Sequence, residues 1–149
     1  MWIAEIAERA IMAAIAGLDV TFRASRVDNA TDSETERKTY PAMVIMASGG
    51  NSESTESLFQ EVPVTVQIIT HYEDDPKRTT LAGLEDQFRK IVNVPIATNT
   101  IRTAFNAAAI AAGETFYLKG ITDIEGGPVE ITDKQQTITT TMILRTCGS

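Results

Sequence analysis

The chain has 149 residues and a mass of 16.2 kDa, so we expect a single domain over residues 1–149. Apolar residues make up 43% and charged residues 22%, which is typical of a folded globular protein. The net charge of −7 has the wrong sign for a protein that grips nucleic acid phosphates. One cysteine and one histidine exclude an internal disulfide framework and a multi-histidine metal site.

An apolar stripe predicts an amphipathic helix from Trp2 to Ala16. Apolar residues recur at three- and four-residue steps through this run, while Glu5, Glu8 and Arg9 lie largely off the stripe. The run carries charges and is shorter than the ~20 apolar residues that span a bilayer. We therefore expect it to pack on the protein's own core, and we expect no membrane contact.

Two polar stretches follow. Asp19 to Thr39 loses periodicity and gathers charges of both signs, with a short strand near Val20 to Ala24. Gly49 to Glu61 is polar and acidic, which predicts a mobile hairpin tip. Long exposed connections are often functional, so we place partner contacts on them. The candidates are Arg23, Arg26, Arg37, Lys38, Glu53, Glu56 and Phe59.

Two strands are predicted on either side of the second polar stretch. Tyr40–Ala47 is a short apolar run with Pro41 at its start, where a missing amide donor is tolerated. Glu61–Tyr72 alternates clearly, which indicates one buried face and one mostly polar face. The buried set is Val62, Val64, Val66 and Ile68, and the opposite set is Pro63, Thr65, Gln67 and Ile69.

Two helices are predicted next. Asp75 is the cap of the first, and Pro76 stands at its first helical position. Its apolar stripe is Leu81, Leu84, Phe88, Ile91 and Val92. After a break at Asn93 to Pro95, Thr98 or Thr100 caps the second helix, which ends at Gly113. The second stripe is Ile101, Phe105, Ala108 and Ala112.

The C-terminal third returns to strands. Phe116–Ile124 alternates, Gly126-Gly127 turns the chain, and a long strand runs from Gln136 to Thr146. In that last strand Ile138, Met142 and Leu144 stand against Thr139, Thr141 and Arg145. The threonine-rich run suits a sheet whose outer face meets another subunit, so Thr139 and Thr141 join the candidate contacts.

The elements come in the order helix, strand, strand, helix, helix, strand, strand. This order predicts an α+β fold, in which one antiparallel sheet carries its helices on one face. We find no internal repeat.

The densest polar cluster is His71, Glu73, Asp74 and Asp75. It could hold a hard divalent cation, but the helix start explains it better. His71 has no accompanying Gly-x-Ser-x-Gly elbow, and Cys147 near the C-terminus has no sequence neighbour that would activate it as a nucleophile. We therefore expect a protein that is not an enzyme, with no cofactor and no metal.

Several segments together resemble the small tail-terminator, or tail-completion, proteins of tailed bacteriophages. They are the N-terminal apolar helix, YPAMVIMA, VPVTVQIITHYEDDP, LEDQFRKIV, FYLKGITDIEGG and TITTTMILRTCG. The resemblance covers nearly the whole chain by pattern and order. The bare Ala107-Ala108-Ala109 stretch departs from it, and is explained either by close helix packing or by helix propensity.

This resemblance implies an α+β virion subunit that forms a six-membered ring at the head-proximal end of the tail tube. The ring stops tube polymerisation and meets both the tail tube protein and a head-completion or neck protein. DNA would pass through its lumen without specific binding, and negative walls would let the duplex slide. The subunit would reside in the host cytoplasm during assembly and in the tail or neck of the virion afterwards.

Two alternatives stay open. One is another neck or tail component, such as a stopper or a tube subunit. The other is a small cellular binding module or enzyme subunit, for which a large apolar pocket with converging titratable groups would be the signature.

Overall fold

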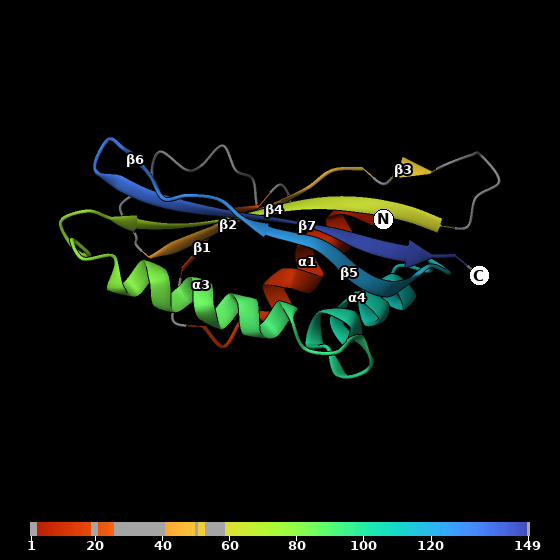
Figure 1. Cartoon of the computed structure of the whole chain (residues 1–149). Helices are drawn as coiled ribbons and strands as arrows, with labels where there is room; N and C mark the ends of the chain where they lie inside the picture. The colour runs from red at the N-terminus through yellow and green to blue at the C-terminus, as the bar shows by residue number, and fades with distance from the viewer. Residues whose placement is uncertain (1–2, 19–20, 26–40, 50, 53–58, 149) are drawn as a thin grey trace.

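The computed structural model describes residues 3–18, 21–25, 41–49, 51–52 and 59–148 (Figure 1). Its helices are α1 (Ile3–Ala14), α3 (Thr79–Val92) and α4 (Thr100–Ala111), with a 3-10 turn, η2 (Ile96–Thr98). Its strands are β1 (Thr21–Ser25), β2 (Ala42–Ala47), β3 (Asn51–Ser52), β4 (Phe59–His71), β5 (Tyr117–Gly126), β6 (Glu130–Thr132) and β7 (Gln135–Cys147).

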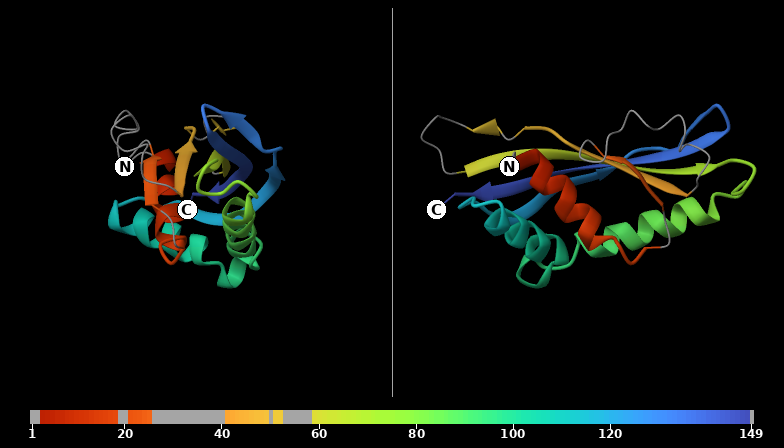
Figure 2. Two further views of the ribbon diagram at one scale, coloured as in Figure 1. Left: turned by 90° about the vertical axis from the view of Figure 1, so that its left-hand side faces the viewer. Right: turned by 180° about the vertical axis from the view of Figure 1, so that it is seen from behind.

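The strands form one sheet in the spatial order β1-β2-β4-β7-β5. Two short strands extend the sheet. β3 pairs with β4 beyond the end of β2, and β6 pairs with β7 beyond the end of β5. In all three ribbon views, α1, α3 and α4 lie on the same side of the sheet (Figures 1 and 2). The predicted α+β class with helices on one face is confirmed.

The pairing differs from the prediction at one edge, where β1 runs parallel to β2 rather than antiparallel. The other strand pairs are antiparallel, as expected. The predicted order also omits β3 and β6, which have two and three residues. Such short strands carry too few residues for alternation to distinguish them from a loop.

The core lies between the sheet and the helices. Alternation along β4 turns Val62, Val64, Val66 and Ile68 inward, as predicted, and each is at most 1% exposed. They pair across the sheet with inward residues of β7, so that Val62 faces Leu144 and Val64 faces Met142. The largest side chains beneath them are Phe88 of α3 and Phe105 of α4, both fully buried.

Helix α1 follows its predicted stripe, with one correction at Glu8. We expected Glu8 off the apolar stripe, but it is fully buried. Its Oε2 accepts a hydrogen bond of 2.8 Å from the backbone amide of Ala47, at the end of β2. The Glu8 carboxylate thereby links α1 to β2 by a tertiary hydrogen bond, which helical periodicity does not predict.

Helix α3 begins at Thr79, three residues later than the prediction with Pro76 in its first position. Asp75 still caps it, because its two carboxylate oxygens accept from the amides of Thr80 (3.0 Å) and Leu81 (2.9 Å). A turn at residues 75–78 lies between cap and helix, and Arg78 adopts a left-handed φ of 61°.

The buried amide of Gln136 fixes this helix start to β7. Its Nε2 donates to the carbonyl of Asp75 at 2.7 Å, and its Oε1 accepts from Arg78 Nε at 2.9 Å. Gln136 is fully buried, so these bonds satisfy a side chain that would otherwise be costly on the inner face.

Helix α4 is capped by Asn99, not by the predicted Thr98 or Thr100. Asn99 Oδ1 accepts from the amide of Ile101 at 2.8 Å. Its Nδ2 lies within 2.9–3.2 Å of the carbonyls of Ile91, Val92 and Val94, which closes the end of α3 as well. Thr98 and Thr100 cannot serve both helix ends, because a hydroxyl offers a single donor.

The predicted stop at Gly113 is confirmed. Gly113 has a φ of 77°, its amide donates to Ile110, and the amide of Glu114 reaches back to Ala109 at 2.9 Å. This pair of bonds is the Schellman arrangement, which favours glycine at the left-handed position.

The turn predicted at Gly126-Gly127 is wrong. Gly126 ends β5, and the place where its Cβ would stand is taken by the Arg89 guanidinium of α3. The chain reverses at Asp133-Lys134, where both residues have positive φ (48° and 66°) and join β6 to β7. That geometry is typical of a two-residue hairpin turn, whose usual sequences are Asn-Gly and Asp-Gly. The sequence here is Asp-Lys, so it gives no such signal.

Candidate functional site

The candidate site is the sheet face that points away from the helices. Alternation places Pro63, Thr65, Gln67 and Ile69 of β4 there, in register with Ile143, Thr141, Thr139 and Thr137 of β7. Val44 and Met46 of β2 pair with Gln67 and Thr65 and continue the surface sideways. No helix within the described residues covers this face (Figures 1 and 2).

We call the centre of this face the uncharged band. It comprises the outward side chains of β4 from Pro63 to Ile69, those of β7 from Thr137 to Ile143, and Val44 and Met46. None of them is ionisable, although charged residues make up 22% of the chain. Met46 is 38% exposed and Thr141 is exposed, so the band meets solvent.

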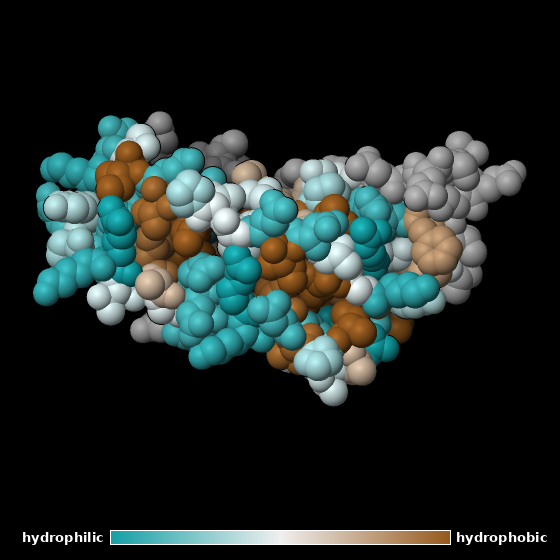
Figure 3. All heavy atoms as spheres, viewed as in Figure 1, coloured by the Kyte–Doolittle hydropathy of each residue, from teal (hydrophilic) through white to brown (hydrophobic). Residues whose placement is uncertain are grey.

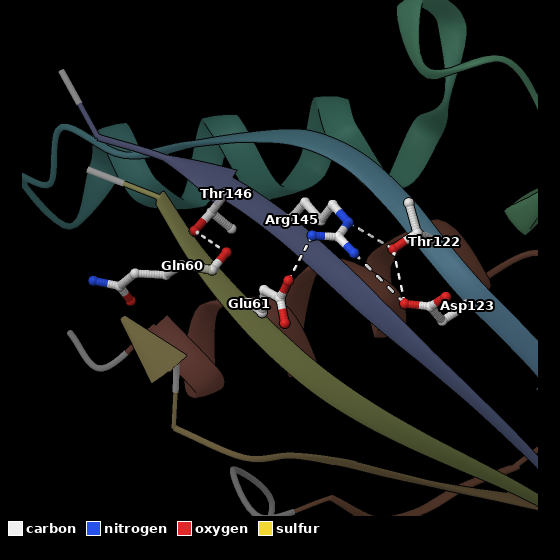
Figure 4. Close-up of polar contacts among 6 residues, drawn as sticks. All are labelled: Gln60, Glu61, Thr122, Asp123, Arg145 and Thr146. Carbon is white, nitrogen blue, oxygen red and sulfur yellow. Dashed lines mark hydrogen bonds and ion pairs between the residues drawn. The ribbon is translucent and has the colours of Figure 1, made fainter. Parts of the chain in front are cut away.

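Charges begin at one end of the band, around Arg145 of β7 (Figure 4). Its Nε donates to Thr122 Oγ1 at 2.8 Å, its Nη1 binds Glu61 Oε1, and its Nη2 lies 3.6 Å from Asp123 Oδ2. One guanidinium thus joins β4, β7 and β5. The charged side chains of Glu61, Asp123 and Arg145 are about half exposed, so each ion pair is worth at most ~1 kcal/mol, but together the contacts fix the side chains in place.

An aromatic row stands at the end of the face. Phe59 and Tyr117 flank Cys147 across three neighbouring strands, with exposures of 54% and 41% for the two rings. Lys119 Nζ lies 5.0 Å from the centre of the Phe59 ring, within cation–π range. A hydrogen bond with the Cys147 side chain raises the pKa of the Tyr117 hydroxyl above its ordinary value.

Three of the predicted contact residues lie on this surface. Thr139 and Thr141 are in the uncharged band, as the alternation implied. Phe59 is exposed, but it belongs to β4 and not to a hairpin tip, which corrects its placement. Arg23 is in β1, at the edge of the described sheet. Arg26, Arg37, Lys38, Glu53 and Glu56 lie outside the described residues, as does the predicted mobility of their loops.

Sequence reasoning missed Tyr117, Lys119, Met46 and the Arg145 cluster as surface features. Their shared signal is the register between strands distant in the chain, since Glu61 and Arg145 are directly opposite but 84 residues apart. A single sequence contains the alternation of each strand but not the alignment between strands.

The polar cluster at His71 is dispersed by the fold. Asp75 is buried under the start of α3, which confirms the cap interpretation. Glu73 pairs with Lys134 at 3.3 Å, and its amide donates to His71 Nδ1 at 3.2 Å. Within the described ranges, no three His, Cys, Asp or Glu side chains group as a metal site requires.

Comparison with models of known protein families and with curated proteins gave no match. None of the helices in the described part of the chain is long and apolar enough to cross a membrane.

Proposed function

We propose that this chain is a structural subunit of a tailed bacteriophage particle, of the tail-terminator kind. In this proposal, six copies form a ring on the head-proximal end of the tail tube. The ring ends tube polymerisation and presents a surface to a head-completion or neck protein. Its work is done by shape and by subunit contacts, and no bond of a substrate is broken.

The observation that supports this proposal is a sheet with helices on one face and, among the described residues, no helix on the other. Three helices bury one face, and the other presents an uncharged band that ends in an ordered ionic cluster and exposed aromatic rings. Aromatic residues, Met and Arg are enriched at protein interfaces, whereas the cores of interfaces are depleted in charge. Such a face suits a contact with another protein.

The net charge of −7 also fits a ring through which DNA passes without binding, as this function would require. Six copies would carry a large net negative charge. Where that charge faced the lumen it would repel DNA phosphates, so that the duplex would slide and not adhere. A ring built to bind DNA would need the opposite sign.

The test is to remove the chain from the particle. A phage with a stop codon early in this gene, grown with and without a plasmid copy of the wild-type chain, is examined by negative-stain electron microscopy. We expect tails of uneven length and heads without tails, both restored by the plasmid. A reconstruction of the restored particle is expected to show six copies at the head-proximal end of the tube.

Normal particles without the chain would refute the proposal. Copies along the whole tail would make the chain a tube subunit, and a ring at the neck with normal tail lengths would make it a stopper. Each outcome therefore decides between the proposed function and its structural alternatives.

A further inference from the structure

The sheet ends on one side at β5. This strand pairs with β7, and no described strand lies on its other side. A strand in that position presents unpaired main-chain amides and carbonyls, to which an extended chain can add. The strand also carries the apolar residues Leu118, Ile121 and Ile124, and Figure 3 shows hydrophobic side chains among hydrophilic ones on the side of the molecule where β5 lies. Such an edge is a site of aggregation unless something blocks it.

Two bulges interrupt this edge. Leu118 and Gly120 pair with successive residues of β7, so Lys119 between them is one residue too many. Between Thr122 and Glu125, β5 advances by three positions while β7 advances by two. Each bulge therefore contains one extra residue, which bends the strand and increases its local twist. A second strand laid along β5 would need matching bulges to keep its own hydrogen bonds.

The second bulge is fixed by its own side chains (Figure 4). Asp123 has a left-handed φ of 55°, which is uncommon for a residue other than glycine. Its Oδ2 accepts from Thr122 Oγ1 at 3.4 Å and lies 3.6 Å from Arg145 Nη2. The ionic cluster around Arg145 thereby holds the irregular backbone of the edge in place.

At the start of the strand, a side chain occupies one of the edge amides. The amide of Leu118 donates to Asn106 Oδ1 of α4 at 2.8 Å. Asn106 thus takes the place that a carbonyl of an added strand would need. Farther along the strand, Lys119, Asp123 and Glu125 are exposed charged residues, whose water an added strand would have to displace.

We propose that β5 is a closed edge, at which the bulges, the Asn106 contact and the charges together prevent an extended chain from adding to the sheet. The closed edge comprises residues 117–126. This goes beyond the proposed function, because it states which surface is not available for assembly. It applies to a second copy and to any other extended chain alike, since both would need the same main-chain hydrogen bonds.

The bulges permit a direct test, because deletion of one extra residue leaves the register on either side unchanged. Without Asp123, Ile124 lies opposite Met142, and the neighbouring pairs keep their partners. Deletion of Lys119 makes the first bulge regular in the same way. Deletion of Pro128 is the matched control, because it shortens the connection between β5 and β6 without changing the paired residues of either strand.

Thioflavin T fluorescence and sedimentation velocity measure strand addition between copies. We expect no thioflavin signal from the wild-type chain or from the Pro128 deletion. Each bulge deletion is expected to give a signal and to self-associate about tenfold more tightly than the wild type, an effect of the size of one added main-chain hydrogen bond. Asp75→Ala, which weakens the start of α3 and leaves β5 unchanged, is the control for association through unfolded chains.

A second variant tests the edge without a deletion. Asn106→Ala keeps a good helix former in α4 and leaves the amide of Leu118 without its acceptor. We expect hydrogen exchange of this amide to become about tenfold faster, and self-association to become tighter. Asn106→Asp keeps an acceptor oxygen at the same place and is expected to restore both values to those of the wild type.

Folded bulge deletions that keep the wild-type mass and give no thioflavin signal would overturn the proposal. An equal signal from Asp75→Ala would overturn it too, because association would then follow from unfolding. Should circular dichroism show that neither deletion folds, Asn106→Ala decides, and unchanged self-association of that variant would overturn the proposal. The particle experiment is independent, because tail length reports the terminator function and not the state of this edge.

Discussion

The cap of α3 provides the sharpest test of how this fold is held together. Asp75 is 5% exposed and accepts hydrogen bonds from the amides of Thr80 and Leu81 at 3.0 and 2.9 Å. Replacing Asp75 with alanine removes both acceptors while the amide of Leu81 stays buried. Loss of an N-cap costs about 1 kcal/mol, and a buried donor without a partner costs about 1–3 kcal/mol more.

We therefore expect Asp75→Ala to lower the free energy of unfolding by about 2–4 kcal/mol. For a chain of this length that corresponds to a fall of roughly 6–12 °C in melting temperature. Asp75→Asn keeps one acceptor oxygen and is expected to lose about half as much. Urea titration followed by circular dichroism measures both values, with the exposed neighbour Asp74→Ala as the matched control.

Asp74→Ala is expected to stay within about 0.5 kcal/mol of the wild-type chain. Equal effects at positions 74 and 75 would indicate a general acidic contribution to the helix dipole and not a specific cap. An Asp75→Ala variant as stable as the wild type would refute the assignment of Asp75 as the residue that starts α3.

Three further substitutions test other junctions. Asn99→Ala should cost about 2–4 kcal/mol in urea unfolding, because one buried amide serves both α3 and α4, whereas Thr98→Ala should change stability by less than about 0.5 kcal/mol. Gly113→Ala should cost about 1 kcal/mol in thermal unfolding because of its φ of 77°, and Gly17→Ala, with open space around it, should not destabilise. A double-mutant cycle of Arg145→Ala and Glu61→Ala should give a coupling free energy of less than about 1 kcal/mol, and this coupling should shrink in high salt. A larger coupling that salt does not change would contradict the half-exposed geometry of the pair.

The long regular elements and two of their ends, the Asp75 cap and the Gly113 stop, could be predicted from the sequence, whereas the other junctions could not. The alternation in β4 and the stripe in α3 each repeat over enough residues to determine both element type and buried face. Three of the errors, at Pro76, Gly126 and Glu8, have one cause in common, because each of these residues fits two roles. Arg78 with its positive φ delays the helix, Arg89 fills the place beside Gly126, and β2 supplies a donor to Glu8. Each depends on a contact distant in sequence.

The same reasoning explains what was missed in the candidate site. Thr139 and Thr141 follow from alternation within β7 alone. In α4 the predicted stripe is confirmed, because Ile101 and Phe105 are fully buried while Ile110, on the opposite side of the helix, is 75% exposed.

Under the proposed function, the sheet face that no described helix covers has to satisfy two opposing demands. Before assembly it must stay soluble, and threonine and glutamine hydroxyls and amides keep the band hydrated without exposing a large apolar patch. During assembly it must release that water at low cost, which ionised side chains would prevent. Uncharged polar residues such as Thr65, Gln67 and Thr139 meet both demands, and the charges of Glu61 and Arg145, paired with each other at the end of the band, do not oppose the second. The composition of this face is therefore what we expect of a surface that is exposed for part of the protein's life and covered for the rest.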